Sequence, residues 1–212
     1  MHKKLITTAV NTAILSSMLS VPMLASAQSG AQLEEVVVTA RKRTESMQDV
    51  PIAVTVFTAQ DIQDAGIERP QDFIGLTPNV SIVDTANAGD TQVTIRGQYS
   101  TRDAESSFAY VVDGVLITNP NGFNGELFDV EQIEVLKGPQ GALYGRNATS
   151  GAILVTTARP DNEFTGKVMA GVGDDSLVKG QAMVSGPIIQ DQLYGRIAFS
   201  YRDTDGQFKN KF

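Results

Sequence analysis

The sequence predicts an α+β domain of short strands and short helices, followed by three long antiparallel strands. Two observations lead to this prediction. Between residues 49 and 159, short β-prone runs alternate with capped helical turns and with turns marked by glycine and proline. After Pro160, apolar and polar side chains alternate strictly over three stretches of about ten residues each.

Residues 1–27 have the features of a cleaved signal peptide. Residues 2–4 are a basic start, residues 5–19 form a mostly apolar run, and Ala25-Ser26-Ala27 is a small-x-small cleavage site. A membrane anchor is the alternative, but the run is short compared with the about 20 apolar residues that a membrane-spanning helix needs. We therefore expect a protein that is exported across a bacterial inner membrane.

The composition restricts the chemistry that the chain can perform. The chain has 212 residues, no Cys and no Trp, and its single His is His2. Removal of the signal peptide would leave no Cys or His for metal binding, for a thiol nucleophile or for a catalytic triad. Any catalysis would have to rest on carboxylates, Ser, Thr, Tyr, Lys or Arg, and the aspartates do not have the spacing of a calcium loop. We expect no metal, no cofactor and no enzymatic activity. The formal net charge of −7 also disfavours nucleic acid as a partner, since nucleic-acid binding requires a basic surface.

An isolated β-prone run, Leu-Glu-Glu-Val-Val-Val-Thr-Ala, occupies residues 33–40. Charged and polar residues follow it at positions 41–46. A single strand beside a polar linker cannot fold alone. The strand therefore either pairs within the following domain or is kept free to add to the sheet of a partner, and the residues themselves favour neither alternative.

The domain is expected to begin with a strand at residues 50–57. Thr58 and Asp61 then match a capping box, in which the side chain of each residue accepts a hydrogen bond from the backbone N–H of the other. The helix that starts there should end at Gly66, because glycine readily takes the positive φ that follows a helix. Pro70 should open a second short helix, since its fixed φ suits the first helical position.

Further strands are expected at residues 80–83 and 91–96, where apolar and polar residues alternate. Residues 108–118 predict a hairpin, because Asp113-Gly114 suits a two-residue turn between apolar runs. Polar loops lie between these elements, at residues 97–107 and 119–125.

Residues 134–157 combine a strand, a glycine-rich turn with a short helix, and a second strand. Gly138-Pro139 should end the first strand, residues 140–144 should form the helical turn, and Gly145 should end it. A phosphate-binding loop is the alternative interpretation. Such a loop requires Lys and then Ser or Thr directly after its last glycine, whereas Arg146 follows Gly145 here. We therefore interpret the stretch as a tightly packed structural turn.

Three alternating strands are expected at residues 164–172, 178–186 and 193–202, joined by turns at residues 173–176 and 187–192. Their apolar side chains fall on one face and their polar side chains on the other. The polar set includes Lys167, Lys179, Gln181 and Arg196. This alternation is typical of transmembrane β-barrel strands around a wet interior. An ordinary half-buried antiparallel sheet would show it too, so the pattern alone leaves both structures open.

Several motifs follow one another in a specific order. Behind the signal peptide they are EEVVVTA at 34–40, DVPIAVTVF at 49–57, TIRG at 94–97, VVDGV at 111–115, IEVLKGPQGALYGRNATSGAI at 133–153, SGPI at 185–188 and AFSYRDTDG at 198–206. Each motif is weak alone, but their order and spacing are specific. Over almost its whole mature length, the chain resembles the N-terminal part of a TonB-dependent outer-membrane receptor.

The resemblance implies a fold and a set of domain boundaries. Members of that family have a barrel of about 22 strands with a globular plug inside it. The implied parts are a signal peptide at 1–27, a TonB box with a flexible linker at 28–44, an α+β plug domain (a small mixed sheet with short helices) at 45–160, and about three first antiparallel strands of an incomplete transmembrane β-barrel at 161–212.

The resemblance also implies partners and site residues. The TonB box would be a free strand that is grasped by the periplasmic C-terminal domain of TonB, through Glu34, Glu35, Val36, Val37, Val38, Thr39 and Ala40. Three charged plug residues would pair with charges on the barrel wall, namely Arg96, Glu134 and Arg146. Two plug loops would face an extracellular ligand, through Gln98, Tyr99, Ser100, Arg102, Asn119, Asn121 and Phe123.

The implied function is active transport across the outer membrane, with a small-molecule ligand such as a ferric siderophore. The alternative is a stand-alone soluble periplasmic plug module that binds TonB without transport. Because three strands cannot close a barrel, and lipid does not tolerate an open sheet edge, we expect the sequence to be the N-terminal fragment of a longer receptor or a truncated product.

Overall fold

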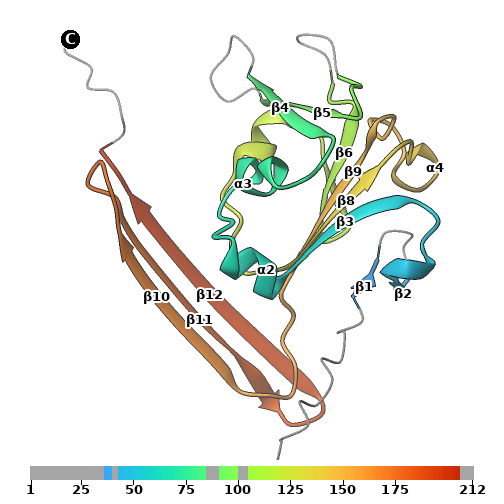
Figure 1. Ribbon diagram of the computed structural model, residues 1–212. Coiled ribbons are helices and arrows are strands. Elements are labelled where there is room, and N and C mark those ends of the chain that lie inside the picture. The colour runs from blue at the N-terminus through green and yellow to red at the C-terminus, as the bar shows by residue number, and fades with distance from the viewer. Residues whose placement is uncertain (1–35, 40–42, 85–90, 100–104, 206–212) are drawn as a thin grey trace, which may run out of the picture. The chain divides into compact units, whose positions relative to one another are not determined.

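A mixed sheet of five strands forms the centre of the α+β domain (Figure 1). The structure, a computed structural model, describes residues 36–39, 43–84, 91–99 and 105–205, without the side chains of Asp84, Pro120 and Asn121. The predicted signal peptide lies outside these residues. The strand order is β3 (Ala53–Thr58), β8 (Val130–Lys137), β9 (Gly151–Thr157), β6 (Phe108–Val112) and β7 (Val115–Ile117). Strands β9 and β6 run parallel and the other neighbours run antiparallel.

One face of this sheet buries the main core. It is packed against α2 (Ala59–Asp64), α3 (Pro70–Gly75), the hairpin of β4 (Val80–Asp84) and β5 (Thr91–Ile95), and the 3-10 helix η2 (Pro120–Asn124). The buried residues of this core are large and mostly branched or aromatic, namely Phe57, Ile67, Phe73, Ile74, Val93, Ile95, Phe108, Tyr110, Phe123, Ile133, Val135, Ile153 and Val155.

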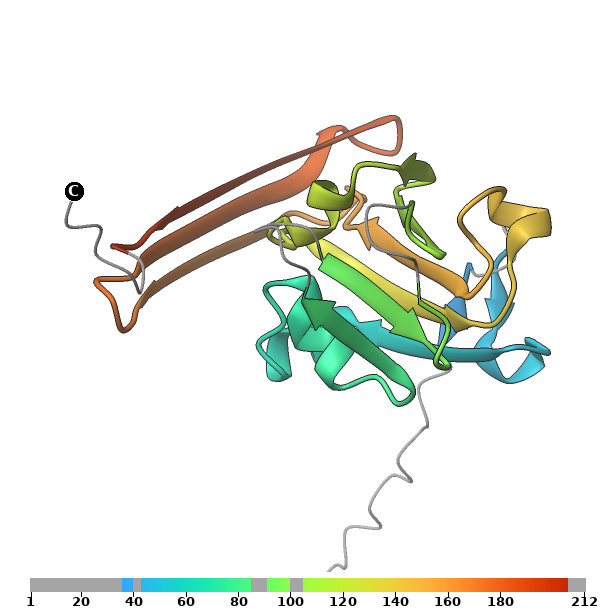
Figure 2. The ribbon, with the colours of Figure 1, turned by 90° about the horizontal axis from the view of Figure 1, so that it is seen from above.

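The opposite face of the sheet carries a smaller cluster. Strand β1 (Val37–Val38) and α4 (Gly141–Tyr144) lie on this side, as Figures 1 and 2 both show. Strand β1 pairs antiparallel with β2 (Glu45–Ser46), and the 3-10 helix η1 (Met47–Asp49) follows. The buried members of this cluster are Val38, Val50, Ala109, Val111, Leu136, Ala148, Ala152 and Leu154.

The local signals for helices and turns are confirmed. In the capping box, Asp61 N–H donates to Thr58 Oγ1 at 3.2 Å, and Thr58 N–H donates to Asp61 Oδ2 at 2.9 Å. Pro70 is the first residue of α3, and the hairpin turn has φ of 48° at Asp113 and 83° at Gly114. Among the described residues, no helix is long and apolar enough to cross a membrane.

The stretch 134–157 folds as the tightly packed turn that its glycines predict. It runs from β8 through α4 into β9, and α4 ends at Gly145, which has a φ of 76°. A Cβ at Gly151 would lie only 2.2 Å from Leu136 O. Glycine is therefore required there, since any side chain would push β9 away from β8.

The last three strands form a separate antiparallel meander of β10 (Thr165–Val172), β11 (Val178–Ile189) and β12 (Leu193–Asp203) (Figure 2). The predicted alternation is confirmed, because Val168 is paired with Ala182, and Ala182 with Phe199, on one face. That face is strongly exposed and apolar: Phe164, Val168, Val172, Val178, Val184, Ile197, Phe199 and Tyr201.

Strand β11 is longer than expected. A turn was predicted for residues 187–192, but β11 continues through Pro187 to Ile189. The register of its pairing with β12 shifts between Pro187 and Ile189. Proline lacks the N–H that a regular ladder needs, and such an irregularity is where a strand tolerates it.

Candidate functional site

Part of the predicted TonB-binding segment is docked on the domain. Met47 N–H donates to Val36 O at 2.9 Å, and Val37 lies opposite Ser46 in the β1–β2 pairing. Gln132 Nε2 donates to Val37 O at 2.8 Å. The expectation of a free strand is therefore wrong for residues 36–39, because β2 and the central sheet supply their partners. The remaining predicted residues, Glu34, Glu35 and Ala40, lie outside the described part of the chain.

Val38 and Thr39 attach this segment to the central sheet. The side chain of Val38 is 0% exposed and belongs to the smaller cluster. Thr39 makes two hydrogen bonds to one carboxylate oxygen: its N–H and its Oγ1 donate to Glu134 Oε1 at 2.8 and 2.9 Å. Hydrogen bonds to an ionised carboxylate are about twice as strong as those between neutral groups. The carboxylate of β8 therefore holds a residue that is 95 positions earlier in the chain.

Glu134 is a buried ionisable group in the centre of the sheet. Its side chain is 1% exposed, and burial raises the pKa of its carboxyl while the two bonds from Thr39 oppose that rise. Oε2 is buried and has no hydrogen-bond partner within the described ranges. Burial and, secondly, the Glu134 carboxylate raise the pKa of the Tyr144 hydroxyl to about 12. Within the described ranges, the two hydrogen bonds from Thr39 to Oε1 are thus the contacts that stabilise the charge of Glu134.

The three residues expected to meet charges on a barrel wall have different surroundings. The expectation for Glu134 is corrected, because its side chain lies on the same sheet face as Leu136 and binds Thr39. Arg96 is exposed, with a φ of 52°, and its N–H donates to Asn79 O at 2.9 Å. Arg146 Nη1 forms an exposed ion pair with Glu105 Oε1 at 3.3 Å. Pairing of these two arginines with a barrel wall stays a prediction.

The predicted ligand-facing residues divide into exposed and buried positions. Gln98, Tyr99 and Asn119 are exposed. Phe123 is 3% exposed, and its ring makes edge contacts with Phe108 and Tyr110 at centroid distances of 5.2 and 5.0 Å. The expectation that Phe123 faces a ligand is therefore wrong, because it anchors η2 in the main core. Ser100, Arg102 and the side chain of Asn121 lie outside the described part of the structure.

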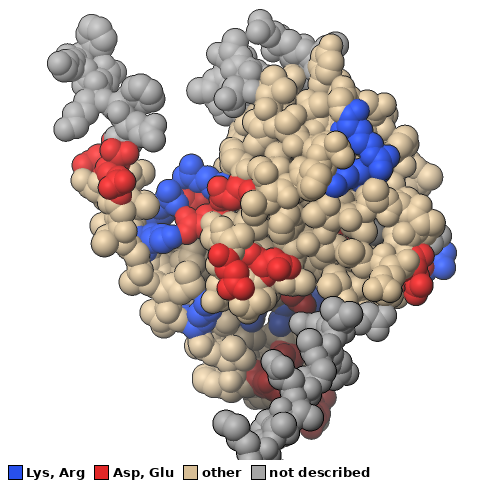
Figure 3. Space-filling model, viewed as in Figure 1, with Lys and Arg blue, Asp and Glu red and all other residues tan. Residues whose placement is uncertain are grey.

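A set of ion pairs joins the α+β domain to the polar face of β10–β12, and the sequence did not predict them. Arg196 donates two hydrogen bonds to Asp129, at 2.7 Å from Nε and 2.5 Å from Nη2. Glu68 binds both Lys179 and Arg202. Figure 3 shows acidic and basic side chains next to one another on this side of the molecule. The alternation had placed Lys179 and Arg196 on the polar face, but it could not identify their acidic partners.

A second contact links Arg202 to the same domain. Arg202 Nε lies 3.2 Å from Glu126 Oε1 without the geometry of a hydrogen bond. The pKa of Glu68 is lowered, primarily by its hydrogen bond to Lys179, with Arg202 adding to the effect and partial burial opposing it. The carboxylate of Glu68 is therefore held in its charged form between two cations.

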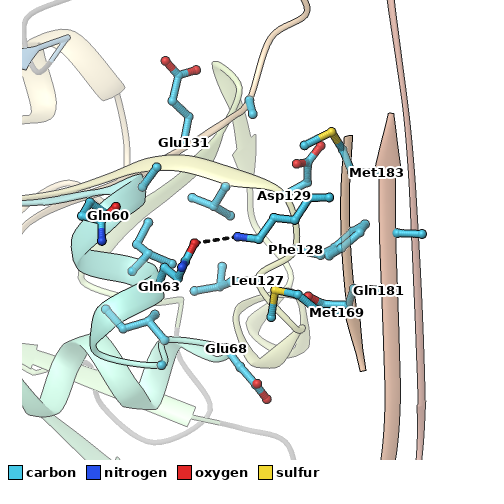
Figure 4. A pocket seen from close by; sticks show the side chains of 18 of the residues that line it. Gln60, Gln63, Glu68, Leu127, Phe128, Asp129, Glu131, Met169, Gln181 and Met183 are labelled. Carbon is cyan, nitrogen blue, oxygen red and sulfur yellow. Dashed lines mark hydrogen bonds between the residues drawn. The ribbon is translucent and has the colours of Figure 1, made fainter. Parts of the chain in front are cut away.

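A pocket of about 330 Å³ lies beside these contacts (Figure 4). Gln60 and Gln63 of α2 line one side, and Met169, Gln181 and Met183 line the other. Lys167 Nζ donates to Gln63 Oε1 at 2.7 Å across the pocket. The lining mixes amides, thioethers and charges of both signs, so its charge selects no class of ligand.

Comparisons with known proteins agree on one family. The pesticin receptor of Yersinia pestis is 32% identical over 195 residues, which are 91% of this chain and 29% of that receptor. The ferripyoverdine receptor of Pseudomonas aeruginosa is 29% identical over 183 residues, 82% of this chain and 21% of that receptor. The chain thus spans less than a third of the length of these relatives.

Solved structures give the same result for the fold. The crystal structure of the ferric yersiniabactin uptake receptor FyuA from Yersinia pestis matches with a TM-score of 0.66 at 30% identity, covering 70% of this chain and 24% of that one. The structure of the outer-membrane ferripyoverdine receptor of Pseudomonas aeruginosa matches with a TM-score of 0.68 at 23% identity, covering 80% of this chain and 22% of that one, which is evidence for the fold alone.

These matches confirm the predicted fold class, a plug domain with a mixed sheet and few helices followed by antiparallel strands of an unclosed barrel. The family model of the TonB-dependent receptor plug domain matches residues 46–152, half of the 212 residues. The chain therefore belongs to the TonB-dependent receptor plug domain family.

Proposed function

We propose that this chain forms the plug and the first barrel strands of a TonB-dependent active transporter in the bacterial outer membrane. In this proposal, residues 1–27 are a cleaved signal peptide and residues 28–44 contain the TonB box and its linker. The plug occupies residues 45–160, and residues 161–212 belong to the barrel. The receptor takes up a small-molecule ligand with energy supplied through TonB, and it catalyses no covalent reaction.

The observation that carries the proposal is the contrast between the two faces of β10–β12. The outer face exposes large apolar side chains, including Val168 at 82% and Phe199 at 63%. Contiguous apolar surface of this kind is not stable against water, whereas lipid would cover it. The inner face instead forms ion pairs with the plug through Lys179, Arg196 and Arg202. A barrel wall with a plug inside it requires this combination.

The same contrast argues against a stand-alone soluble module, which would leave that apolar face in water. Cell fractionation of the receptor that contains this chain separates the two proposals. We expect it in the outer membrane, with gel migration that changes on heating. Recovery in the soluble periplasmic fraction would support the soluble module.

We infer a ferric siderophore as the ligand. Two relatives bear on this choice, because one is named for ferripyoverdine and one solved structure is that of a ferric yersiniabactin uptake receptor. Another relative, 31% identical over 150 residues, is the vitamin B12 transporter of Vibrio vulnificus. The exposed plug residues Gln98, Tyr99 and Asn119 would meet the ligand together with barrel loops.

Uptake of radioactive iron tests the function and the ligand class together. Cells that express the receptor would be offered ferric hydroxamate, catecholate and phenolate complexes and, in a parallel assay, radiolabelled cobalamin, with and without a functional TonB. We expect uptake of at least one complex, and only when TonB is present. Equal uptake without TonB would contradict the transport mechanism, whereas TonB-dependent uptake of cobalamin alone would overturn the siderophore assignment.

A further inference from the structure

The two edges of β1 have different occupants. Backbone groups point alternately to opposite sides along a strand. Because Met47 N–H donates to Val36 O, the backbone N–H and C=O groups of residues 36 and 38 point toward β2. Residues 37 and 39 therefore point their backbone groups to the other edge, which we call the pairing edge.

The pairing edge is occupied by two side chains of β8. Gln132 Nε2 donates to Val37 O, and Glu134 Oε1 accepts the N–H of Thr39, at 2.8 Å in both cases. Gln132 and Glu134 lie on the same face of β8, two residues apart, with the spacing of the backbone groups that they bind. A partner strand that adds to this edge would need the same two backbone groups.

We propose that Glu134, assisted by Gln132, occupies the pairing edge of β1 and competes with the incoming strand of TonB. This inference rests on the proposed function, since TonB is the partner that it concerns. TonB can bind only those receptor molecules in which the segment is released from Glu134. The apparent affinity of TonB is therefore its affinity for the released segment multiplied by the fraction of molecules in that state. Glu134 thereby sets how readily the receptor engages TonB in the absence of ligand.

The local environment suits a contact that can be broken. Glu134 is buried in the sheet, yet the Thr39 that binds it is exposed. A cleft of about 390 Å³ lies beside Thr39, lined by Leu116, Leu143 and Tyr144 among others. Thr39 can therefore leave the carboxylate without opening the central sheet. Its departure would remove the two donors of a buried charge, which favours return of the segment.

The test compares Glu134→Gln with Glu131→Gln in the purified full-length receptor without ligand. Glutamine has nearly the shape of glutamate but is a weaker, uncharged acceptor. Glu131 is an exposed residue of the same strand, which makes it a matched control. Two quantities would be measured: the Kd for the isolated periplasmic domain of TonB, and the mobility of a spin label at Val37→Cys. These 212 residues contain no Cys, so the label site is unique within this chain.

We expect E134Q to increase the mobility at residue 37 and to bind the TonB domain about tenfold more tightly, with E131Q matching the parent. Thr39→Val, which keeps the backbone donor and loses Oγ1, should give an intermediate mobility. Unchanged mobility and unchanged Kd in E134Q would overturn the proposal. If no variant and no parent receptor binds the TonB domain, the proposed function fails, and the mobility at residue 37 alone decides whether Glu134 holds the segment.

Discussion

At the scale of single residues, Glu134 carries a pH dependence opposite to that of most carboxylates. Burial raises the pKa of its carboxyl in the folded protein. Its contribution to stability is therefore fully present below the pKa of the unfolded chain, and it is lost as pH rises through the higher folded pKa. A carboxylate whose folded pKa is depressed, such as Glu68, behaves in the reverse way.

This sign can be measured with the Glu134→Gln variant, which has no proton to lose. We expect equal unfolding temperatures for the parent and E134Q at pH 4. At pH 8 we expect E134Q to be more stable than the parent and to unfold at a higher temperature, because only the parent then carries the buried charge. Calorimetry of both proteins at the two pH values provides the comparison. A difference that does not change with pH would mean that Glu134 does not titrate as inferred.

Phe123 provides a second prediction at this scale, because its burial contradicts a role in ligand contact. It fills the core between Phe108 and Tyr110. Phe123→Ala should destabilise the plug by about 3–5 kcal/mol through the cavity that it creates. Phe123→Leu should cost less and leave the affinity for ligand unchanged. Denaturant unfolding and ligand titration of both variants test this, and a Leu variant with normal stability but weak ligand binding would restore the ligand-facing role.

At the scale of elements, the two edges of the docked strand β1 have different roles. One edge pairs with β2, and the other is the pairing edge that we propose for TonB. The N–H of Val37 points away from β2, as judged from the bond between Met47 and Val36. Val37→Pro should therefore preserve the β1–β2 pairing while removing one donor from the pairing edge. We expect TonB-dependent uptake to be lost and ligand binding to remain.

Val37→Ala is the matched control for that variant, because it shortens the side chain and keeps the N–H. Uptake by the Ala variant should remain close to that of the parent. If the proline variant also transports normally in whole-cell uptake, residues 34–40 are not the segment that TonB grasps.

The contact between the plug and β11–β12 leads to a further prediction at this scale. Lys179 and Arg202 lie directly opposite each other, and like charges in this position destabilise a sheet by up to about 1 kcal/mol. Glu68 lies between them and binds both. Glu68→Gln should therefore speed hydrogen exchange in β11 and β12.

A second substitution distinguishes this electrostatic effect from a general loss of packing. Adding Lys179→Gln to Glu68→Gln removes one of the two cations, and the double variant should exchange more slowly than E68Q alone. Exchange that is faster in the double variant would show that Glu68 acts by packing and not by charge.

At the scale of the whole molecule, what the sequence could predict depended on how local each signal was. The capping box at Thr58, the turn at Asp113 and the alternation in β10–β12 are set by neighbouring residues, and all were predicted. The bond between Thr39 and Glu134 joins residues 95 positions apart, and that between Arg202 and Glu68 spans 134 positions. No periodicity encodes such pairs. Phe123 was misassigned for a related reason, since its neighbours are polar and only the fold brings Phe108 and Tyr110 to it.

The two faces of the meander give the prediction that concerns the whole receptor. Val168 lies on the apolar outer face and is 82% exposed, whereas Gln181 lines the inner pocket. If lipid covers the outer face, Val168→Lys should cost about 2–4 kcal/mol near the middle of the membrane, and less near its edges. Gln181→Lys adds the same charge on the wet side and should cost little. The folded fraction of the full-length receptor in outer membranes, measured from heat-dependent gel migration, should fall for V168K and remain normal for Q181K. Equal loss in both variants would mean that the two faces do not have different surroundings, and the assignment of the meander to a barrel wall would fail.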